Sequence, residues 1–551
     1  MDGALSMSFS SKQLYNPDVL SEIFLSLTSY DQYDPNSQPL KALRLASHVC
    51  SSWRQLILSS PVIWARNINV DELNHMTDDW RSEVLRRTGD AVLSIKGTGR
   101  HLSAKSERFI VSLLRDSWHR IKYIQICLSP LSRHRSRAFS QILRTPAPNL
   151  EHFAVGNIEV VYSNEQDNDE VERAEELVLG DDGWKYYSVS FGGKAPRLKH
   201  FSCPALLLPA VSQPWFSQVL HLECGEINGR NLLNALPYMP NLETLHVHIT
   251  TDLPEIPVFS PADGIILPRL HDVRITTYSP WRVGLAILVA LQPRPEFKLD
   301  FDVQDGVGDV SIEDADAIKH VLSQLFTGTS PDLKEDCHLQ AVFYDTVFEI
   351  TIPQKFRLSF STWDSLSALL GILRMPLAPF YHATELNIDI KYSVVNPHSD
   401  TMAQFFSSLT LVHSLKTDME TLVYIHKLSL RYDDTHLLPS LRHLELLNYD
   451  KFLANMIEEF LDYRHDPYGT PILSLTCHGL WGDNLSNLER FNGILFRGCF
   501  GDEEVHYVCG SGNPERLDFT ATAIADGNSE IEEMEILKAL AALSTFFSSA
   551  L

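Results

Sequence analysis

The sequence predicts an α/β protein in which a short N-terminal helical unit precedes an irregular solenoid of strand-plus-helix units. Two observations lead to this prediction. Apolar residues recur at helical spacing between residues 14 and 64, and a Pro-x-Leu signature recurs ahead of alternating segments from about residue 90 onward. A chain of 551 residues would suit roughly three or four ordinary domains or one elongated repeat array. The recurring signature favours the array.

The first predicted helix begins at Pro17, where Asn16 can cap it and Asp18 suits the positive end of the helix dipole. Its apolar residues follow the i, i+3, i+4, i+7 spacing of one helix face, and they are Leu20, Ile23, Phe24 and Leu27. This face requires a cover.

A second short helix is expected from about Pro39, and a third one follows it. The third helix is expected to run through Val49, Trp53, Leu56 and Ile57. It should end before Pro61, because the residue that precedes a proline is pushed out of the α region. Pro61 then starts a new turn that carries Trp64 back against the helices. About 50 residues bury too little of their apolar surface alone, which implies a partner or a neighbouring domain.

The repeat signature places a leucine two residues after a proline, just before an alternating strand. The complete copies span residues 147–155, 195–203, 239–249, 267–275 and 438–447. Their spacing is irregular, from 28 residues between Pro240 and Pro268 to 48 between Pro148 and Pro196. Between about 280 and 380 the signature fades. Stacked units of this kind bury a ladder of apolar side chains and line one side of an arc with strands.

These patterns divide the chain into four segments. Residues 1–13 are expected to be disordered, 14–68 form the helical unit, 90–525 form the solenoid, and 528–551 form a C-terminal helix. That helix starts at the capping-box residues Ser529 and Glu532. It either caps the open end of the array or packs as an ordinary surface helix.

Charge and cysteine content narrow the classes of partner. The formal net charge of −24 opposes nucleic-acid binding, and no run of residues is long and apolar enough for a membrane span. Between Arg100 and Arg144 ten Lys or Arg residues stand against two acids, and residues 151–182 hold eleven acids and one Arg. This contrast fits either a basic groove beside an acidic flap or two solvated segments.

Eight scattered cysteines and no signal peptide indicate a cytosolic or nuclear protein.

No pattern of catalytic or metal-binding residues stands out. The 22 histidines include no pair spaced for zinc, so strand histidines such as His246 and His248 are expected to be exposed or hydrogen-bonded. The glycines of residues 305–310 do not fit a calcium loop, because Phe301 stands where that loop requires an acid, and they do not fit a phosphate loop, because the Gly-Lys-Ser/Thr sequence is missing. We therefore predict no catalytic residue, no metal site and no cofactor.

Three short motifs nevertheless resemble a known family. The motifs are Pro17-Asp18-x-Leu20-x-x-Ile23-Phe24, then Val49-Cys50-x-x-Trp53-Arg54, then Ser60-Pro61-x-x-Trp64. In this order and spacing they resemble the F-box, over residues 14 to about 68. Together with the Pro-x-Leu copies, the chain resembles fungal, basidiomycete-like F-box proteins with leucine-rich-repeat-like C-terminal regions. Tyr15 and Asn16 depart from that pattern, because the family usually has Leu or Pro there.

The resemblance implies a non-catalytic substrate receptor of a Skp-cullin-F-box ubiquitin ligase. The F-box would dock on a Skp-type adaptor and through it on a cullin, and the repeats would bind a protein target. The residues implied in adaptor binding, either by contact or by packing, are Pro17, Leu20, Ile23, Phe24, Val49, Trp53, Leu56 and Trp64. The alternative is an interaction scaffold that keeps the F-box fold without recruiting a ligase.

Overall fold

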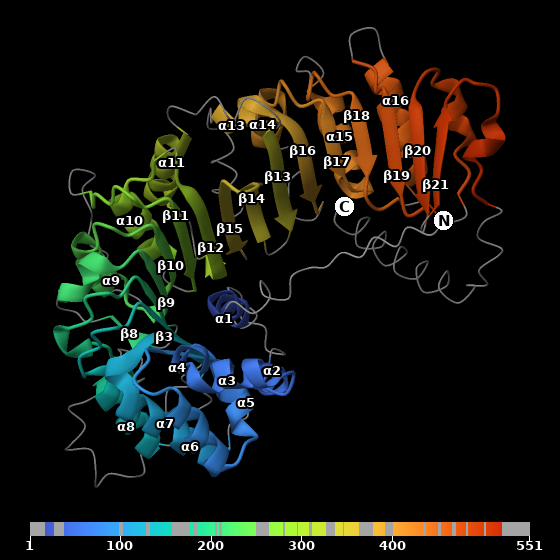
Figure 1. Ribbon diagram of the computed structural model, residues 1–551. Helices are drawn as coiled ribbons and strands as arrows, with labels where there is room; N and C mark the ends of the chain where they lie inside the picture. Colours follow the sequence, from blue (N-terminus) through green and yellow to red (C-terminus); the bar gives the residue numbers. More distant parts are fainter. Residues whose placement is uncertain are drawn as a thin grey trace, which may run out of the picture. The chain divides into compact units, whose positions relative to one another are not determined.

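The computed structural model divides into two compact units, Met1–Asp305 and Gly306–Leu551 (Figure 1). The structure describes residues 17–26, 38–98, 103–127, 133–156, 177–179, 185–203, 206–208, 212–249, 264–278, 281–294, 296–307, 311–326, 337–344, 347–362, 378–391, 400–432, 437–449, 453–465, 470–480, 483–500 and 503–520. The predicted N-terminal segment 1–13, the cap at Asn16 and the predicted helix 528–551 lie outside these residues.

Short helices open the first unit: α1 (Pro17–Ser26), α2 (Pro39–Ala46), α3 (Ser51–Ser59) and α4 (Pro61–Ala65). Proline at the first position of α1, α2 and α4 is favourable, because the first amides of a helix have no partner within it. Cys50 is extended and caps α3, accepting a hydrogen bond from the Trp53 amide at 3.5 Å. The third helix therefore begins at Ser51, and Val49 precedes it.

Glu72 links this helical unit to the start of the sheet through hydrogen bonds to α2. It lies on α5 (Val70–Asn74), directly after β1 (Ile68–Asn69). Its carboxylate accepts the amide hydrogens of Leu40 at 2.9 Å and of Lys41 at 2.5 Å, and so caps α2 from a distant part of the chain. Burial raises the pKa of Glu72, whereas these two hydrogen bonds lower it.

A parallel sheet backed by helices forms the body of the first unit (Figure 1). Each strand pairs in parallel with the next in this order: β1, β2 (Leu93–Gly97), β3 (Ile121–Cys127), β4 (His152–Gly156), β7 (His200–Cys203), β9 (His221–Ile227), β10 (Thr244–Ile249), β11 (Asp272–Thr277) and β12 (Lys298–Val307). The helices that back this sheet are α6 (Asp78–Arg87), α7 (Ala104–Ser117), α8 (Arg133–Leu143), α9 (Gly229–Ala235) and α10 (Trp281–Leu291). A small separate sheet joins β5 (Leu177–Leu179), β6 (Lys185–Ser188) and β8 (Leu206–Leu207).

The Pro-x-Leu signature is a β-turn that delivers a leucine to the core. In each complete copy the leucine amide donates to the carbonyl of the residue before the proline, over 3.0–3.3 Å. The five leucines are at most 1% exposed, and they are Leu150, Leu198, Leu242, Leu270 and Leu441. A strand begins two residues after each of them, at β4, β7, β10, β11 and β18 (His443–Leu446). The α/β class and the repeated strand-helix units are thereby confirmed.

In three of the five complete copies the residue between the proline and the leucine links its turn to the preceding repeat unit by a side-chain hydrogen bond. Asn149 Nδ2 donates to the His119 carbonyl at 2.7 Å, and Asn241 Nδ2 donates to the Ser217 carbonyl at 2.8 Å. In the second unit Ser440 Oγ donates to Thr410 O at 2.6 Å. These bonds satisfy turn carbonyls that no ladder partner reaches.

The second unit combines parallel strands with antiparallel hairpins. The parallel strands are β13 (Cys337–Tyr344), β16 (Ala383–Ile390), β17 (Ser414–Thr417), β18, β19 (Ser474–His478) and β20 (Leu495–Phe500). Antiparallel pairs add β14 (Val347–Ile352) and β15 (Phe356–Thr362) beside β13, and β21 (Glu503–Val508) beside β20. The helices are α11 (Ile312–Phe326), α13 (Ala378–His382), α14 (Asp400–Ser408), α15 (Met419–Arg431) and α16 (Ala454–His465). Because hairpins need no crossover helix, the repeat signature fades where β13–β15 lie.

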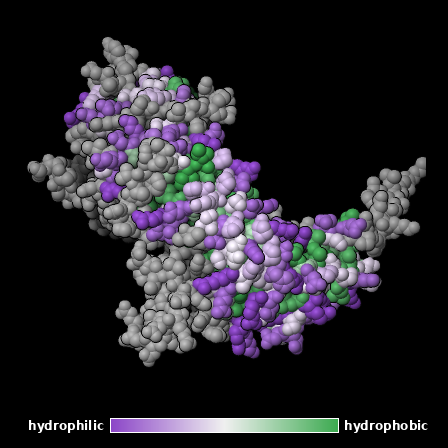
Figure 2. Space-filling model, turned by 90° about the vertical axis from the view of Figure 1, so that its left-hand side faces the viewer, coloured by the Kyte–Doolittle hydropathy of each residue, from purple (hydrophilic) through white to green (hydrophobic). Residues whose placement is uncertain are grey.

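Most exposed positions of the described residues are polar, with isolated apolar exceptions. On the face drawn in Figure 2, hydrophilic residues surround a few compact hydrophobic patches. Isolated exposed apolar side chains are common on proteins, so only their grouping on particular elements carries meaning.

Candidate partner-binding surfaces

The structure separates the predicted adaptor-binding residues on α1 into buried and exposed ones. Leu20 and Phe24 are 7% and 1% exposed, whereas Ile23 is 42% exposed. Pro17 occupies the first helical position, and its side chain lies outside the described residues. One face of α1 therefore packs inward while Ile23 remains accessible to a partner.

Trp53 and Leu56 on α3 are half-buried. The Trp53 indole meets the Phe24 ring edge-on, with ring centroids 5.1 Å apart and planes at 81°, which is a favourable aromatic geometry. This contact joins α3 to α1. Val49, in the turn before α3, is 64% exposed.

Trp64 on α4 belongs to the core. Its side chain is 1% exposed, and its indole N–H donates to the Ile57 carbonyl at 2.8 Å. The Arg87 guanidinium lies over the ring at 4.6 Å from its centroid. Any effect of Trp64 on partner binding is therefore exerted through packing.

Further exposed apolar side chains on these helices were not identified from the sequence. They are Val19, Leu45, Leu58 and Val62, each at least 43% exposed. Helical periodicity identifies the apolar residues that face the core. These four residues fall outside that spacing, so the periodicity gave no role to them. With Ile23 and Val49 they make the helical unit unusually apolar at its surface.

Positive charge accompanies the part of this apolar surface that residues 38–66 contribute, whereas α1 exposes Asp18 and Glu22 beside Val19 and Ile23. Residues 38–66 contain four basic residues and no Asp or Glu, in a chain of net charge −24. The four are exposed, and they are Lys41, Arg44, Arg54 and Arg66. A partner of complementary charge would present acidic residues around an apolar contact.

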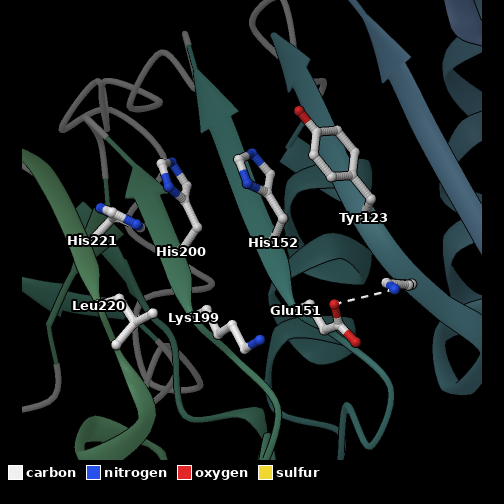
Figure 3. A pocket seen from close by; sticks show the side chains of 8 residues that line it. Tyr123, Glu151, His152, Lys199, His200, Leu220 and His221 are labelled. Atoms are coloured by element: carbon white, nitrogen blue, oxygen red, sulfur yellow. Dashed lines mark ion pairs between the residues drawn. The ribbon is translucent and has the colours of Figure 1, made fainter. Parts of the chain in front are cut away.

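A row of stacked rings crosses the exposed side of the first unit's sheet. Tyr123, His152, His200 and His221 face one another at matching positions of β3, β4, β7 and β9, and we call them the ring row. Ring centroids lie 4.1 Å apart from Tyr123 to His152 and from His152 to His200, with planes within 12°. His221 is tilted by 42° at 5.5 Å from His200. Figure 3 shows these rings, one from each strand.

Burial lowers the pKa of His152 to about 3 and that of His200 to about 4, and the neighbouring imidazoles act in the same direction. Both rings are therefore neutral at pH 7. The sequence contains a signal for this row. His152 and His200 each stand four residues after the proline of their repeat copy, and so occupy equivalent positions.

The described residues hold no group of three or more His, Cys, Asp or Glu side chains arranged to bind a metal ion. The cysteines whose side chains the structure describes are free thiols, and they are Cys50, Cys127, Cys203, Cys224, Cys477, Cys499 and Cys509. Burial raises the pKa of the Cys509 thiol to about 11, and it also raises the pKa values of Cys224 and Cys477.

Among the helices that the structure describes, none has both the length and the apolar character needed to cross a membrane. A comparison of the chain with protein-family models finds no matching model. A search of curated proteins likewise finds no match.

Proposed function

We propose that this protein is a substrate receptor of a Skp-cullin-F-box ubiquitin ligase, in which residues 17–66 dock on a Skp-type adaptor and the repeat units bind a protein target. The protein itself would carry out no chemistry, since ubiquitin transfer belongs to other subunits of such a ligase. The observation that carries the proposal is the coincidence of the F-box motifs with a helical unit that exposes apolar side chains and that, over residues 38–66, also exposes four basic side chains and no acidic one.

The burial pattern divides the proposed roles among the motif residues. Leu20, Phe24 and Trp64 hold the helices together, whereas Ile23 and Val49 present apolar surface that a partner would cover. Fully burying a Val or Ile side chain contributes about 1.5–3 kcal/mol, and a partner would bury only the exposed 42% of Ile23 and 64% of Val49, so each supplies a fraction of that amount. Lys41 and Arg44 on α2 would add electrostatic attraction and a faster association rate.

The test is capture of the full-length protein by a purified Skp-type adaptor. We expect Ile23→Asp and Val49→Asp to abolish capture, because a partner interface would then bury an unpaired carboxylate. Leu430→Asp is the matched control: it places the same charge on an apolar position of α15, in the second unit, whose 57% exposure lies between those of Ile23 and Val49. It should leave capture unchanged.

Capture that survives both substitutions would exclude this docking surface. If the unaltered protein shows no capture and instead retains another stable partner, the alternative of a non-ligase interaction scaffold is supported.

A further inference from the structure

The ring row borders an open, shallow hollow of about 380 Å³ on the first unit's sheet (Figure 3). Its lining combines the four rings with Lys122 of β3 and with the residues directly before β4, β7 and β9, which are Glu151, Lys199 and Leu220. The hollow is lined by strands of four successive repeat units, and the Pro-x-Leu turns position two of them.

The charges of the hollow are not balanced. Lys122 pairs with Glu151 over 3.2 Å, and Glu151 carries the one carboxylate among the described lining residues. Lys199 is exposed and forms no ion pair with a described residue. A cation of this kind, in a chain of net charge −24, attracts an anionic group more strongly than the surrounding surface does.

The imidazoles suit an anionic group as well. His152 and His200 are neutral in the free protein, and a neutral imidazole offers one N–H donor for a hydrogen bond to a carboxylate. Further along the sheet, Glu223 accepts a hydrogen bond from Ser202 Oγ at 2.7 Å. Lys96 lies over the Tyr123 ring at 5.0 Å from its centroid, at the opposite end of the row.

We propose that the ring row and Lys199 bind an acidic peptide segment of a protein partner. A carboxylate side chain would lie against the Lys199 ammonium and the His200 imidazole, and apolar parts of the peptide would contact Leu220 and the ring edges. Nucleic acid is disfavoured as the ligand because its closely spaced phosphates need a cluster of Lys and Arg, whereas the described lining offers Lys199 and a Lys122 that already pairs with Glu151. Identifying this peptide as part of the ligase's protein target rests on the proposed receptor function. The proposal that the hollow binds an acidic peptide does not rest on it.

The experiment measures fluorescence anisotropy of a fluorescein-labelled twelve-residue peptide of alternating Glu and Ser, with purified full-length protein and no adaptor. A Lys-Ser peptide and a twelve-nucleotide oligo-dT carry the same label. We expect saturable binding of the Glu-Ser peptide alone. Lys199→Glu should weaken it by about fivefold or more, since it replaces an attractive charge by a repulsive one.

Lys105→Glu supplies the matched control, because it makes the same change in net charge on an exposed residue of α7, on the helical side of the sheet. It should leave the affinity within about twofold. His200→Ala should also weaken binding, while an unchanged affinity in both Lys199→Glu and His200→Ala would overturn the proposal. Preferential binding of oligo-dT or of the Lys-Ser peptide would overturn it too. Adaptor capture is measured separately. A negative result in the peptide-binding experiment therefore does not bear on the docking of residues 17–66, and a negative result in the capture experiment does not bear on the peptide site.

Discussion

The indole N–H of Trp64 donates a hydrogen bond to the carbonyl of Ile57 at 2.8 Å. In a continuous helix that carbonyl would accept the amide hydrogen of residue 61, but Pro61 has none. The tryptophan thus satisfies a buried acceptor that the proline leaves open. The Ser60-Pro61 break and the tryptophan three residues later form one structural device.

Replacing Trp64 by Phe should destabilise the first unit by about 1–3 kcal/mol, because the Ile57 carbonyl then remains buried without a donor. Loss of part of the ring volume adds to this cost. Urea unfolding followed by far-UV circular dichroism measures the change. Trp80→Phe is the control: Trp80 is half-buried and lies 6.4 Å from the Trp64 ring, and its removal should cost less. Equal losses in the two variants would show that ring packing, not the hydrogen bond, accounts for the effect.

Phe24 and Ile23 are neighbours in sequence, but we predict that truncating them changes the free energy of unfolding by very different amounts. Phe24→Ala should cost about 3–5 kcal/mol, since it removes a ring that is 1% exposed and packs on Trp53. Ile23→Ala should change the free energy of unfolding by less than about 0.5 kcal/mol, because the side chain is 42% exposed. The same unfolding measurement on both variants checks this division. A large loss for Ile23→Ala would show that its exposed side chain supports the fold and is not reserved for a partner.

The repeat turns could be predicted from sequence because each is specified locally. Pro148 and Leu150, for example, set a β-turn and a core position within three residues. The α2 cap could not be predicted, because Glu72 lies 32 residues from Leu40 and no local pattern links them. The ring row falls between these cases: its histidines occupy equivalent repeat positions, but their stacking depends on the parallel register of β3, β4, β7 and β9.

Acidification should destabilise the first unit through the ring row. The pKa values of His152 and His200 are about 3 and 4 in the folded protein, below the ordinary value of 6.5. The unfolded chain therefore binds more protons below pH 6.5, and stability falls as the pH drops from 6.5 toward 4. The loss at pH 5 is about 1 kcal/mol for each histidine after allowance for solvent screening.

The double variant His152→Phe and His200→Phe isolates this contribution. It keeps stacked rings in the row but removes two titrating groups, so its free energy of unfolding should change less between pH 7.5 and pH 5 than that of the unaltered protein. The other charged groups around the row, namely Lys96, Lys122, Glu151, Lys199, His221, Glu223 and His246, are the same in both proteins. An identical pH dependence would exclude the two histidines as its source.

Arg464 at the end of α16 holds the repeat turn before β18. It is 5% exposed, and its guanidinium donates to the carbonyls of Leu437, Leu438 and Leu441 over 3.0–3.3 Å. Leu438 has a φ of 50°, a backbone conformation that a leucine rarely adopts. In the first unit Arg294 binds the carbonyls of Leu267, Pro268 and Leu270 in the same way, 26 residues after the proline of its turn.

Arg464→Met should therefore cost about 2–4 kcal/mol, because it leaves several buried carbonyls without donors and frees a strained turn. Burial lowers the pKa of Arg464 to about 10, so the guanidinium stays charged at pH 7 and the loss should not depend on pH between 6 and 8. Hydrogen exchange of residues 437–447, together with urea unfolding, measures it. Arg442→Met is the matched control, since among the described residues the Arg442 side chain donates to one carbonyl, that of Pro471, at 3.2 Å. Unchanged exchange at Leu441 in the Arg464 variant would mean that the turn keeps its shape without the arginine.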